Sequence, residues 1–236
     1  MLSLPLPFNV AEALKSGFYI SGTTGCGKSD IGMYAADVLR TNGAIVITFD
    51  PTQDWLSRYP YEVLVSLENV GVRTYLQSIK LDKSTLIDTS CLTIPQTQEL
   101  IESFCQSLFN AQAKLKPEQR CQYFVIFEEA QTAFPQGALR ATAFQNAVRL
   151  LTQGRNFKLR IGMVTQFAAM LDKTALRFAT QRYFGWTSEF HDRHYISAFI
   201  GKDAANQLRY LKSGEFMYCL PTEDRLEKIS IQPYGS

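Results

Sequence analysis

One stretch of the chain has residue types and spacing that suit the binding of phosphate. Residues 22–29 read Gly-Thr-Thr-Gly-Cys-Gly-Lys-Ser and match the pattern G-x-x-x-x-G-K-[ST]. Glycines let successive backbone N–H groups point inward, and the start of a following helix favours negative charge. The lysine of such a loop reaches the β- and γ-phosphates of a nucleotide, and the next hydroxyl binds Mg²⁺. The sequence therefore predicts a nucleotide site formed by Gly22, Thr23, Thr24, Gly25, Cys26, Gly27, Lys28 and Ser29.

Cys26 lies inside this loop and has two interpretations. The start of a helix stabilises a thiolate, which would make Cys26 reactive towards alkylating reagents and protected by bound ATP. The alternative is that a small side chain fills a tight loop, and we prefer this alternative.

Two adjacent acids follow an apolar stretch at residues 123–127. Transfer of a phosphoryl group to water needs an acid that organises the metal and a group that orients the attacking water. We assign the first role to Glu128 and the second to Glu129. The alternative is that the pair marks the start of a helix, where negative charge is favourable.

Polar residues follow two further apolar stretches. Gln166 comes directly after residues 160–165, where it could contact the γ-phosphate or the attacking water. Asp50 and Asp54 follow residues 44–49, which would place two acids at the end of that strand. The alternative is that they form an ordinary Asp-Pro turn.

Short buried strands alternate with longer amphipathic helices along the chain. We expect helices over residues 28–40, 99–113 and 138–152, and strands over residues 18–21, 44–49, 84–88, 123–127, 160–165 and 182–186, with a hairpin at 214–220 and 225–231. This order predicts one α/β domain over residues 1–236, with a mostly parallel sheet, helices on both faces, and residues 1–16 as a candidate N-terminal arm. The carboxyl ends of parallel strands meet at one edge, so the acids and Gln166 should face the glycine-rich loop.

Composition excludes several protein classes. The 236 residues are 46% hydrophobic and 19% charged with a net charge of +2, which excludes collagen, coiled coils and wholesale disorder. The apolar runs are too short to span a bilayer, and the N-terminus lacks the basic start of a signal peptide. Five scattered cysteines without a CxxC pattern indicate free thiols in a reducing compartment. We therefore expect a soluble, intracellular protein.

The basic residues are unevenly distributed. Residues 130–188 contain eight Lys and Arg side chains and a single acid, Asp172. Such a segment can face the phosphates of a nucleotide or nucleic acid, or it can simply solvate helix surfaces.

Four segments in order resemble the HerA/FtsK branch of P-loop motor ATPases. They are residues 22–29, Asp-Pro-Thr-Gln-Asp-Trp at 50–55, Phe-Glu-Glu-Ala at 127–130, and Gln-Gly-Arg at 153–155 followed by Val-Thr-Gln at 164–166 and Leu-Asp-Lys-Thr at 171–174. The resemblance covers residues 17–220, and the later motifs select this branch. It implies a RecA-like core that uses ATP and Mg²⁺, assembled as a ring, usually a hexamer, that moves double-stranded DNA.

The resemblance also implies roles for single residues. Lys28 and Ser29 match the positions that hold the nucleotide and the metal. Glu128 takes the metal-organising position, Glu129 that of the catalytic carboxylate, and Gln166 that of the sensor. Such rings place an arginine of one subunit against the γ-phosphate of the next, for which Arg155 is our first candidate and Arg149 the second. Either arginine could instead be a surface charge.

The sequence departs from the family in two ways. The metal-organising acid is usually Asp, and Glu128 is one methylene longer, whereas Mg²⁺ tolerates displaced ligands poorly. We also expect the protein to lack the N-terminal barrel and the membrane or DNA-reading extensions of other members. Its minimal size resembles the genome-packaging ATPases of tailless, membrane-containing icosahedral viruses.

Three functions remain open at this point. The preferred one is an ATP-driven translocase that packages a viral genome in the host cytoplasm or virion, beside capsid or membrane-associated viral proteins. The second is a translocase of a plasmid or mobile element, and the third is a switch or kinase that does not act on DNA. For DNA contacts we expect loops that follow strand ends, at residues 132–140 with Arg140 and at 156–158 with Lys158.

Overall fold

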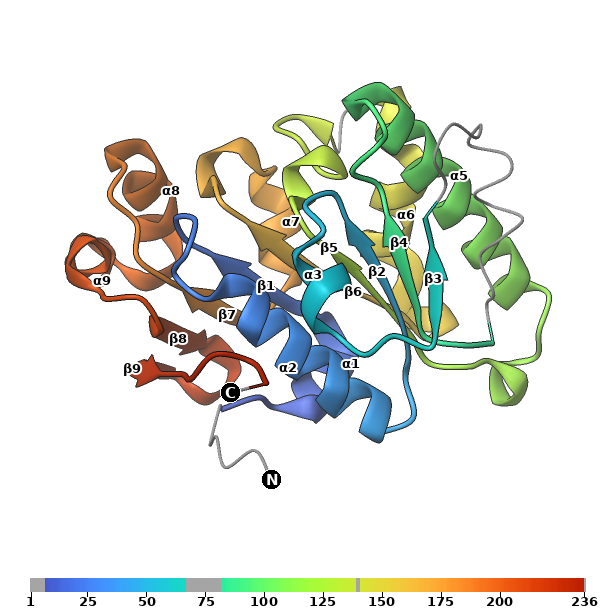
Figure 1. The fold of residues 1–236 in the computed structure, drawn as a ribbon, viewed down its shortest axis with the longest axis horizontal. Helices are drawn as coiled ribbons and strands as arrows, with labels where there is room; N and C mark the ends of the chain where they lie inside the picture. The colour runs from blue at the N-terminus through green and yellow to red at the C-terminus, as the bar shows by residue number, and fades with distance from the viewer. Residues whose placement is uncertain (1–6, 67–81, 139–140, 236) are drawn as a thin grey trace.

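Nine strands form a single sheet in the computed structural model, which describes residues 7–66, 82–138 and 141–235 (Figure 1). The strands lie in the order β3-β4-β2-β5-β6-β1-β7-β8-β9. Their bounds are β1 (Phe18–Ser21), β2 (Ile45–Asp50), β3 (Val63–Val65), β4 (Thr85–Asp88), β5 (Tyr123–Phe127), β6 (Leu159–Thr165), β7 (Gln181–Phe184), β8 (Glu215–Leu220) and β9 (Arg225–Ser230). Strands β1 to β7 pair in parallel, and β8 and β9 form an antiparallel hairpin beside β7. The predicted α/β class, the mostly parallel sheet and the hairpin are confirmed.

Helices cover both faces of this sheet, as expected (Figure 1). One face packs against α1 (Val10–Ser16), α2 (Lys28–Thr41) and α3 (Asp54–Arg58). The other packs against α5 (Ile94–Ala113), α6 (Gln145–Gln153), α7 (Lys173–Phe178), α8 (Phe190–Ile200) and α9 (Lys202–Gln207). The central strands are buried on both sides, which explains why they are apolar throughout rather than alternating.

The strand order brings three strand ends together. Strand β6 lies between β1 and β5, and Ser21 at the end of β1 is paired with Thr165 at the end of β6. On the other side of β6, Phe127 at the end of β5 is paired with Met163. The residues that follow β1, β6 and β5 therefore meet at the carboxyl edge of the sheet.

Two helix boundaries differ from the sequence-based expectation. Helix α5 begins at Ile94 rather than at residue 99, because the side chain of Gln96 accepts a hydrogen bond from the Thr93 backbone and Pro95 is tolerated in a first helical turn. Helix α6 begins at Gln145 rather than at residue 138, where the carboxylate of Glu102 accepts hydrogen bonds from two backbone amides of α6. That cap comes from α5, so local sequence could not reveal it.

The N-terminal region contributes a short helix. Asn9 caps α1 by accepting a hydrogen bond from the Glu12 amide, and α1 contacts β6 and β7. Within residues 1–16, where we expected an arm, residues 1–6 lie outside the described part of the chain. Among the described residues, every helix is too short or too polar to span a bilayer.

Candidate active site

The glycine-rich loop connects β1 to α2, as the motif requires. Gly22, Gly25 and Gly27 have φ values of 150°, 78° and 100°, a region that favours glycine. Lys28 is the first residue of α2 and is buried, and its ammonium group donates a hydrogen bond to the carbonyl of Thr23 at 3.2 Å. The lysine therefore lies across the loop whose backbone would surround a phosphate group.

Cys26 packs inside the protein instead of facing solvent. A Cβ atom built on either Gly22 or Gly185 would lie 2.8 Å from its sulfur, so both positions require glycine to leave room for the thiol. Burial raises the pKa of Cys26, and the charge of Lys28 opposes this shift only in part. The structure supports the preferred interpretation of a packing role, because burial raises the pKa of the thiol, whereas a stabilised thiolate requires a lowered pKa.

Ser29 and Glu128 form the first polar pair of the site. The Ser29 hydroxyl donates a hydrogen bond to Oε1 of Glu128 at 2.8 Å. The indole Nε1 of Trp55 donates to Oε2 of the same carboxylate at 3.4 Å. Burial raises the pKa of Glu128 to about 7, although the Ser29 hydrogen bond and the Lys28 charge act in the opposite direction.

This pair fits a divalent cation. A buried carboxylate gains from a nearby positive charge, because that charge offsets the loss of hydration. Carboxylate and hydroxyl oxygens are ligands that Mg²⁺ accepts, with water filling the remaining positions. The extra methylene of Glu128 is accommodated, since its carboxylate reaches Ser29 directly.

Glu129 lies at the centre of a second polar network. Its Oε1 accepts a hydrogen bond from Nε2 of Gln166 at 2.7 Å, and its Oε2 accepts one from Nε2 of Gln131 at 2.6 Å. The hydroxyl of Thr24 donates to Oε1 of Gln166 at 2.8 Å, so the chain of contacts reaches the glycine-rich loop. Thr165 closes the network by donating to Oε1 of Gln131 at 2.6 Å.

The backbone of Glu129 is unusual. Its φ of 53° is rare for a residue with a side chain, and such conformations are often found at functional sites. The turn sets Glu129 apart from Glu128, so the two neighbouring acids have different partners. The alternative that these acids simply begin a regular helix is wrong, because only a short 3-10 turn at Ala130–Thr132 follows them.

Both networks line one cavity of about 810 Å³. Lys28, Ser29, Glu128, Glu129 and Gln166 all border it, together with Thr24, Gly25 and Gly27 of the loop. The structure therefore brings together the predicted phosphate, metal, carboxylate and sensor residues.

Asp50 has a structural role. It is buried and accepts hydrogen bonds from the backbone amides of Thr52, Trp55 and Leu56, so it fixes the turn into α3. This agrees with the alternative of an Asp-Pro turn. Asp54 does line the cavity, where it forms an ion pair with Arg58 at 3.4 Å.

Arg155 lies at the opposite edge of the sheet. It is exposed, in the 3-10 turn Gly154–Phe157 that precedes β6, whereas Gln166 follows β6. At about 3.3 Å per residue, the seven residues of β6 separate the two by roughly 20 Å. Arg149, the second candidate, lies on α6 with its guanidinium carbon 3.7 Å from the ring centre of Phe109.

One of the two candidate regions for DNA contacts is placed differently from expectation, whereas the described part of the other, residues 132–138, follows β5 as expected. Residues 156–158 precede β6, so the prediction that they follow a strand end is wrong. Lys158 there has a φ of 55°, and its ammonium group donates to the carbonyl of Arg120 at 2.9 Å. Arg140 lies outside the described residues.

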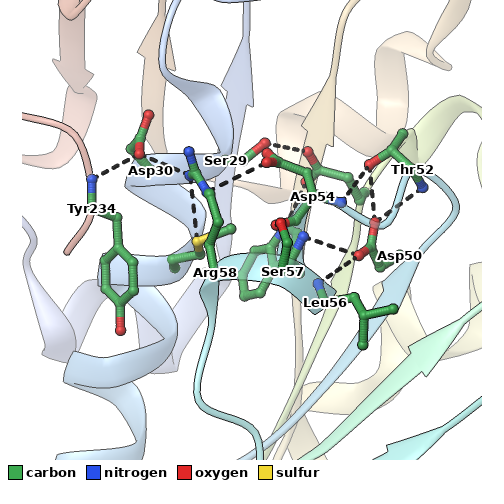
Figure 2. A network of polar contacts seen from close by, with 12 residues as sticks. Ser29, Asp30, Asp50, Thr52, Asp54, Leu56, Ser57, Arg58 and Tyr234 are labelled. Carbon is green, nitrogen blue, oxygen red and sulfur yellow. Dashed lines mark hydrogen bonds and ion pairs between the residues drawn. The ribbon is translucent and has the colours of Figure 1, made fainter.

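Several cavity residues were not predicted. Arg58 forms an ion pair with Asp30, one residue after Ser29, at 2.8 Å, as well as with Asp54 (Figure 2). The spacing of Asp54 and Arg58 by four residues is a signal for an ion pair on one helix. The residues at 212–215 and 230–233 also border the cavity, and local sequence gave no signal for them.

No protein-family model and no curated protein sequence matches this chain. Several solved protein structures do match this chain. The genome-packaging NTPase B204 of Sulfolobus turreted icosahedral virus 2, in complex with sulfate, is 18% identical with a TM-score of 0.69, over 92% of this chain and 97% of that one. The same protein has also been solved with ATP-gammaS.

Two further solved structures are similar at lower identity. VirB4 of Thermoanaerobacter pseudethanolicus is 12% identical with a TM-score of 0.62, over 93% of this chain and 89% of that one. The pCW3 conjugation coupling protein TcpA is 15% identical with a TM-score of 0.52, over 92% of this chain and 60% of that one. The chain thus has the P-loop NTPase fold of these proteins, the fold that its motifs predict.

Proposed function

We propose that this chain is an Mg²⁺-dependent ATPase that uses hydrolysis to move double-stranded DNA, as a viral genome-packaging motor. The chain of hydrogen bonds from Thr24 through Gln166 to Glu129 carries the proposal. It joins the phosphate loop to a carboxylate that can orient water, beside the separate pair of Ser29 and Glu128.

The residues divide the work of hydrolysis among them. Lys28 and the loop amides bind the phosphates, and Ser29 and Glu128 would hold Mg²⁺, which when bound neutralises charge on the phosphate oxygens. Glu129 orients the attacking water and accepts its proton. Gln166 holds Glu129 in place and links it to Thr24, so the state of the γ-phosphate is communicated to the loop.

A ring of subunits, a hexamer by family resemblance, would complete the site. Arg155 is at the far edge of its own sheet, which suits an arginine that acts on the nucleotide of a neighbouring subunit. An arginine of this kind offsets the charge that develops in the transition state.

Two observations support DNA as the substrate. Residues 130–188 are strongly basic, as the backbone of a nucleic acid requires. The similar protein B204 is a genome-packaging NTPase, which supports a role in the host cytoplasm or virion beside capsid or membrane-associated viral proteins. The likeness to TcpA, a conjugation coupling protein, favours a plasmid or mobile-element translocase as the second candidate.

The test measures ATP hydrolysis by the purified chain with Mg²⁺, with and without duplex DNA. We expect DNA to stimulate hydrolysis several-fold and added salt to weaken DNA binding steeply, since bound counterions are released. Lys28→Ala, which removes the phosphate-binding ammonium group, is the inactive control. Hydrolysis that is indifferent to DNA, from a protein that remains a monomer, would favour a switch or kinase instead.

A further inference from the structure

The cavity extends well beyond the groups that would bind phosphate and metal. On one side of the loop it is bordered by Glu128, Glu129 and Gln166. On the other it is bordered by two segments near the C-terminal hairpin, which are residues 212–215 before and at the start of β8 and residues 230–233 at the end of β9. The proposed hydrolysis uses only the first side.

The strand order fixes the direction in which a nucleotide would lie. Glu129 and Gln166 follow β5 and β6, so a γ-phosphate that they contact lies on that side of β1. Strands β7, β8 and β9 lie on the other side of β1. A triphosphate held by the loop therefore directs its nucleoside towards the β8–β9 hairpin.

The two C-terminal segments are tied to the loop by hydrogen bonds. The hydroxyl of Ser213 donates to the carbonyl of Gly25 at 2.8 Å, and the amide of Gly214 donates to the carbonyl of Cys26 at 2.9 Å. The amide of Ile231 donates in turn to the carbonyl of Gly214 at 2.8 Å. The wall of the cavity is thus held at a fixed position relative to the phosphate loop before any ligand arrives.

A further contact anchors the end of the chain. The amide of Tyr234 donates to Oδ1 of Asp30 at 2.8 Å, the same atom that accepts from Arg58 (Figure 2). The Tyr234 ring also packs beside that of Tyr59, with centroids 5.9 Å apart. Residues 230–233 are therefore held at both ends, between Gly214 and Asp30.

The chemistry of this wall suits a nucleoside. Ile231 is buried close to Gly27, where a Cβ atom would lie 3.3 Å from its Cδ1, so it places an apolar group beside the loop. Gln232 and Pro233 are exposed and line the cavity, and a primary amide both donates and accepts hydrogen bonds. Apolar surface with a few polar groups is typical of pockets for small molecules.

We propose that residues 212–215 and 230–233 form the nucleoside subsite, which holds the base and ribose of the bound nucleotide, with Gln232 contacting the base. The inference rests on the proposed function, because it assumes that the loop binds a nucleoside triphosphate. It assigns to the C-terminal segment a part in substrate binding that is separate from hydrolysis.

The test compares ligands with and without a nucleoside. Dissociation constants for ATP, ADP and inorganic tripolyphosphate are measured by calorimetry for the wild type, Gln232→Ala and Gln232→Ala/Pro233→Ala. Because one hydrogen bond contributes modestly to affinity, we expect the single variant to bind ATP and ADP about threefold more weakly and the double variant about tenfold. Affinity for tripolyphosphate should stay within about twofold of the wild type.

Two controls keep this proposal separate from the proposed function. Gln207→Ala changes an exposed glutamine on α9 that does not line the cavity, and it should bind all three ligands as the wild type does. Lys28→Ala should lose affinity for all three. Unchanged ATP binding in the double variant, or an equal loss for ATP and tripolyphosphate, overturns the subsite. A wild-type protein that binds none of the three ligands overturns the proposed function itself.

Discussion

The two edges of the parallel sheet differ in chemistry. At the carboxyl edge, Glu128, Glu129 and Gln166 are engaged in short hydrogen bonds and border one cavity. At the amino edge, Arg155 and Lys158 are exposed, and Arg160 is buried, where burial and the charge of Arg155 lower its pKa to about 10. The carboxyl ends of β5 and β6 are therefore followed by acids and an amide, whereas cations flank the amino end of β6.

This difference bears on the proposed site. In the proposed function, the carboxyl edge supplies the groups that bind the nucleotide and orient water. Among the described residues, the cations that border the cavity are Lys28, Arg58 and Lys212, and Arg58 is already paired with Asp30 and Asp54. Our proposal is that a further arginine for the γ-phosphate comes from the amino edge of another subunit.

The largest expected effect comes from Arg155→Ala. If Arg155 acts on a neighbouring nucleotide, its loss should lower the rate of hydrolysis by roughly 10³-fold, as for arginines that act between subunits. Steady-state ATPase assays measure this rate. The control is Lys114→Ala, which changes an exposed cation directly after α5 and should hydrolyse ATP normally.

Mixing experiments sharpen this prediction. Subunits with Lys28→Ala keep Arg155, so adding them to the Arg155→Ala protein should restore part of its activity. Mixtures that remain inactive would show that Arg155 acts within its own subunit or in folding, and the comparison of the two edges would lose its functional meaning.

Glu129→Gln should lower the rate of hydrolysis by about 10²-fold or more, since the group that accepts the proton of water is lost. Binding of ATP should persist, because Ser29, Glu128 and Lys28 are unchanged. Single-turnover hydrolysis together with nucleotide affinity measures both effects. A wild-type rate in this variant would show that the assignment of the two acids is wrong.

The pKa of Glu128 predicts a pH-dependent stability. Because the pKa is raised from 4.5 to about 7 in the folded state, ionisation of Glu128 costs stability as the pH rises through this window. Glu128→Gln should therefore stabilise the nucleotide-free protein at pH 8 by up to about 3 kcal/mol more than at pH 5. Urea unfolding without Mg²⁺ measures this difference.

Two comparisons check the cause of this effect. Glu99→Gln removes an exposed carboxylate on α5 and is the matched control. With saturating Mg²⁺ and ATP at pH 8, the wild type should be more stable to unfolding than Glu128→Gln, because the ionised carboxylate then binds metal. Equal stabilisation by Glu128→Gln at both pH values would contradict the assigned burial effect.

The smallest effect concerns the thiol in the loop. Cys26 is buried and its pKa is raised, so it should react with iodoacetamide more slowly than the exposed thiols of Cys91 and Cys121. Mass spectrometry after timed labelling identifies the order of reaction, and unfolded protein should label at all positions. Rapid labelling of Cys26 in the folded protein would restore the hypothesis of a stabilised thiolate.

Local sequence was sufficient for the parts of the molecule that depend on near neighbours. The glycine pattern of residues 22–29 requires a strand before it and a helix after it, and both are present. The apolar stretches that end at Phe127 and Thr165 form the expected buried strands. Hydrophobic periodicity did not predict where α5 and α6 begin. A side-chain cap decides the start of α5, and a carboxylate from another helix decides the start of α6.

The sequence by itself therefore determined which residues are candidates for the chemistry, because residue type and spacing set what a loop or a strand end can do. Tertiary structure alone decided which of them meet. The placement of β6 between β1 and β5 joins Gln166 to Glu129, and burial rather than sequence position raises the pKa values of Glu128 and Cys26. The C-terminal wall of the cavity arises the same way, because a hydrogen bond from Ser213 to Gly25 links segments that are far apart in the chain.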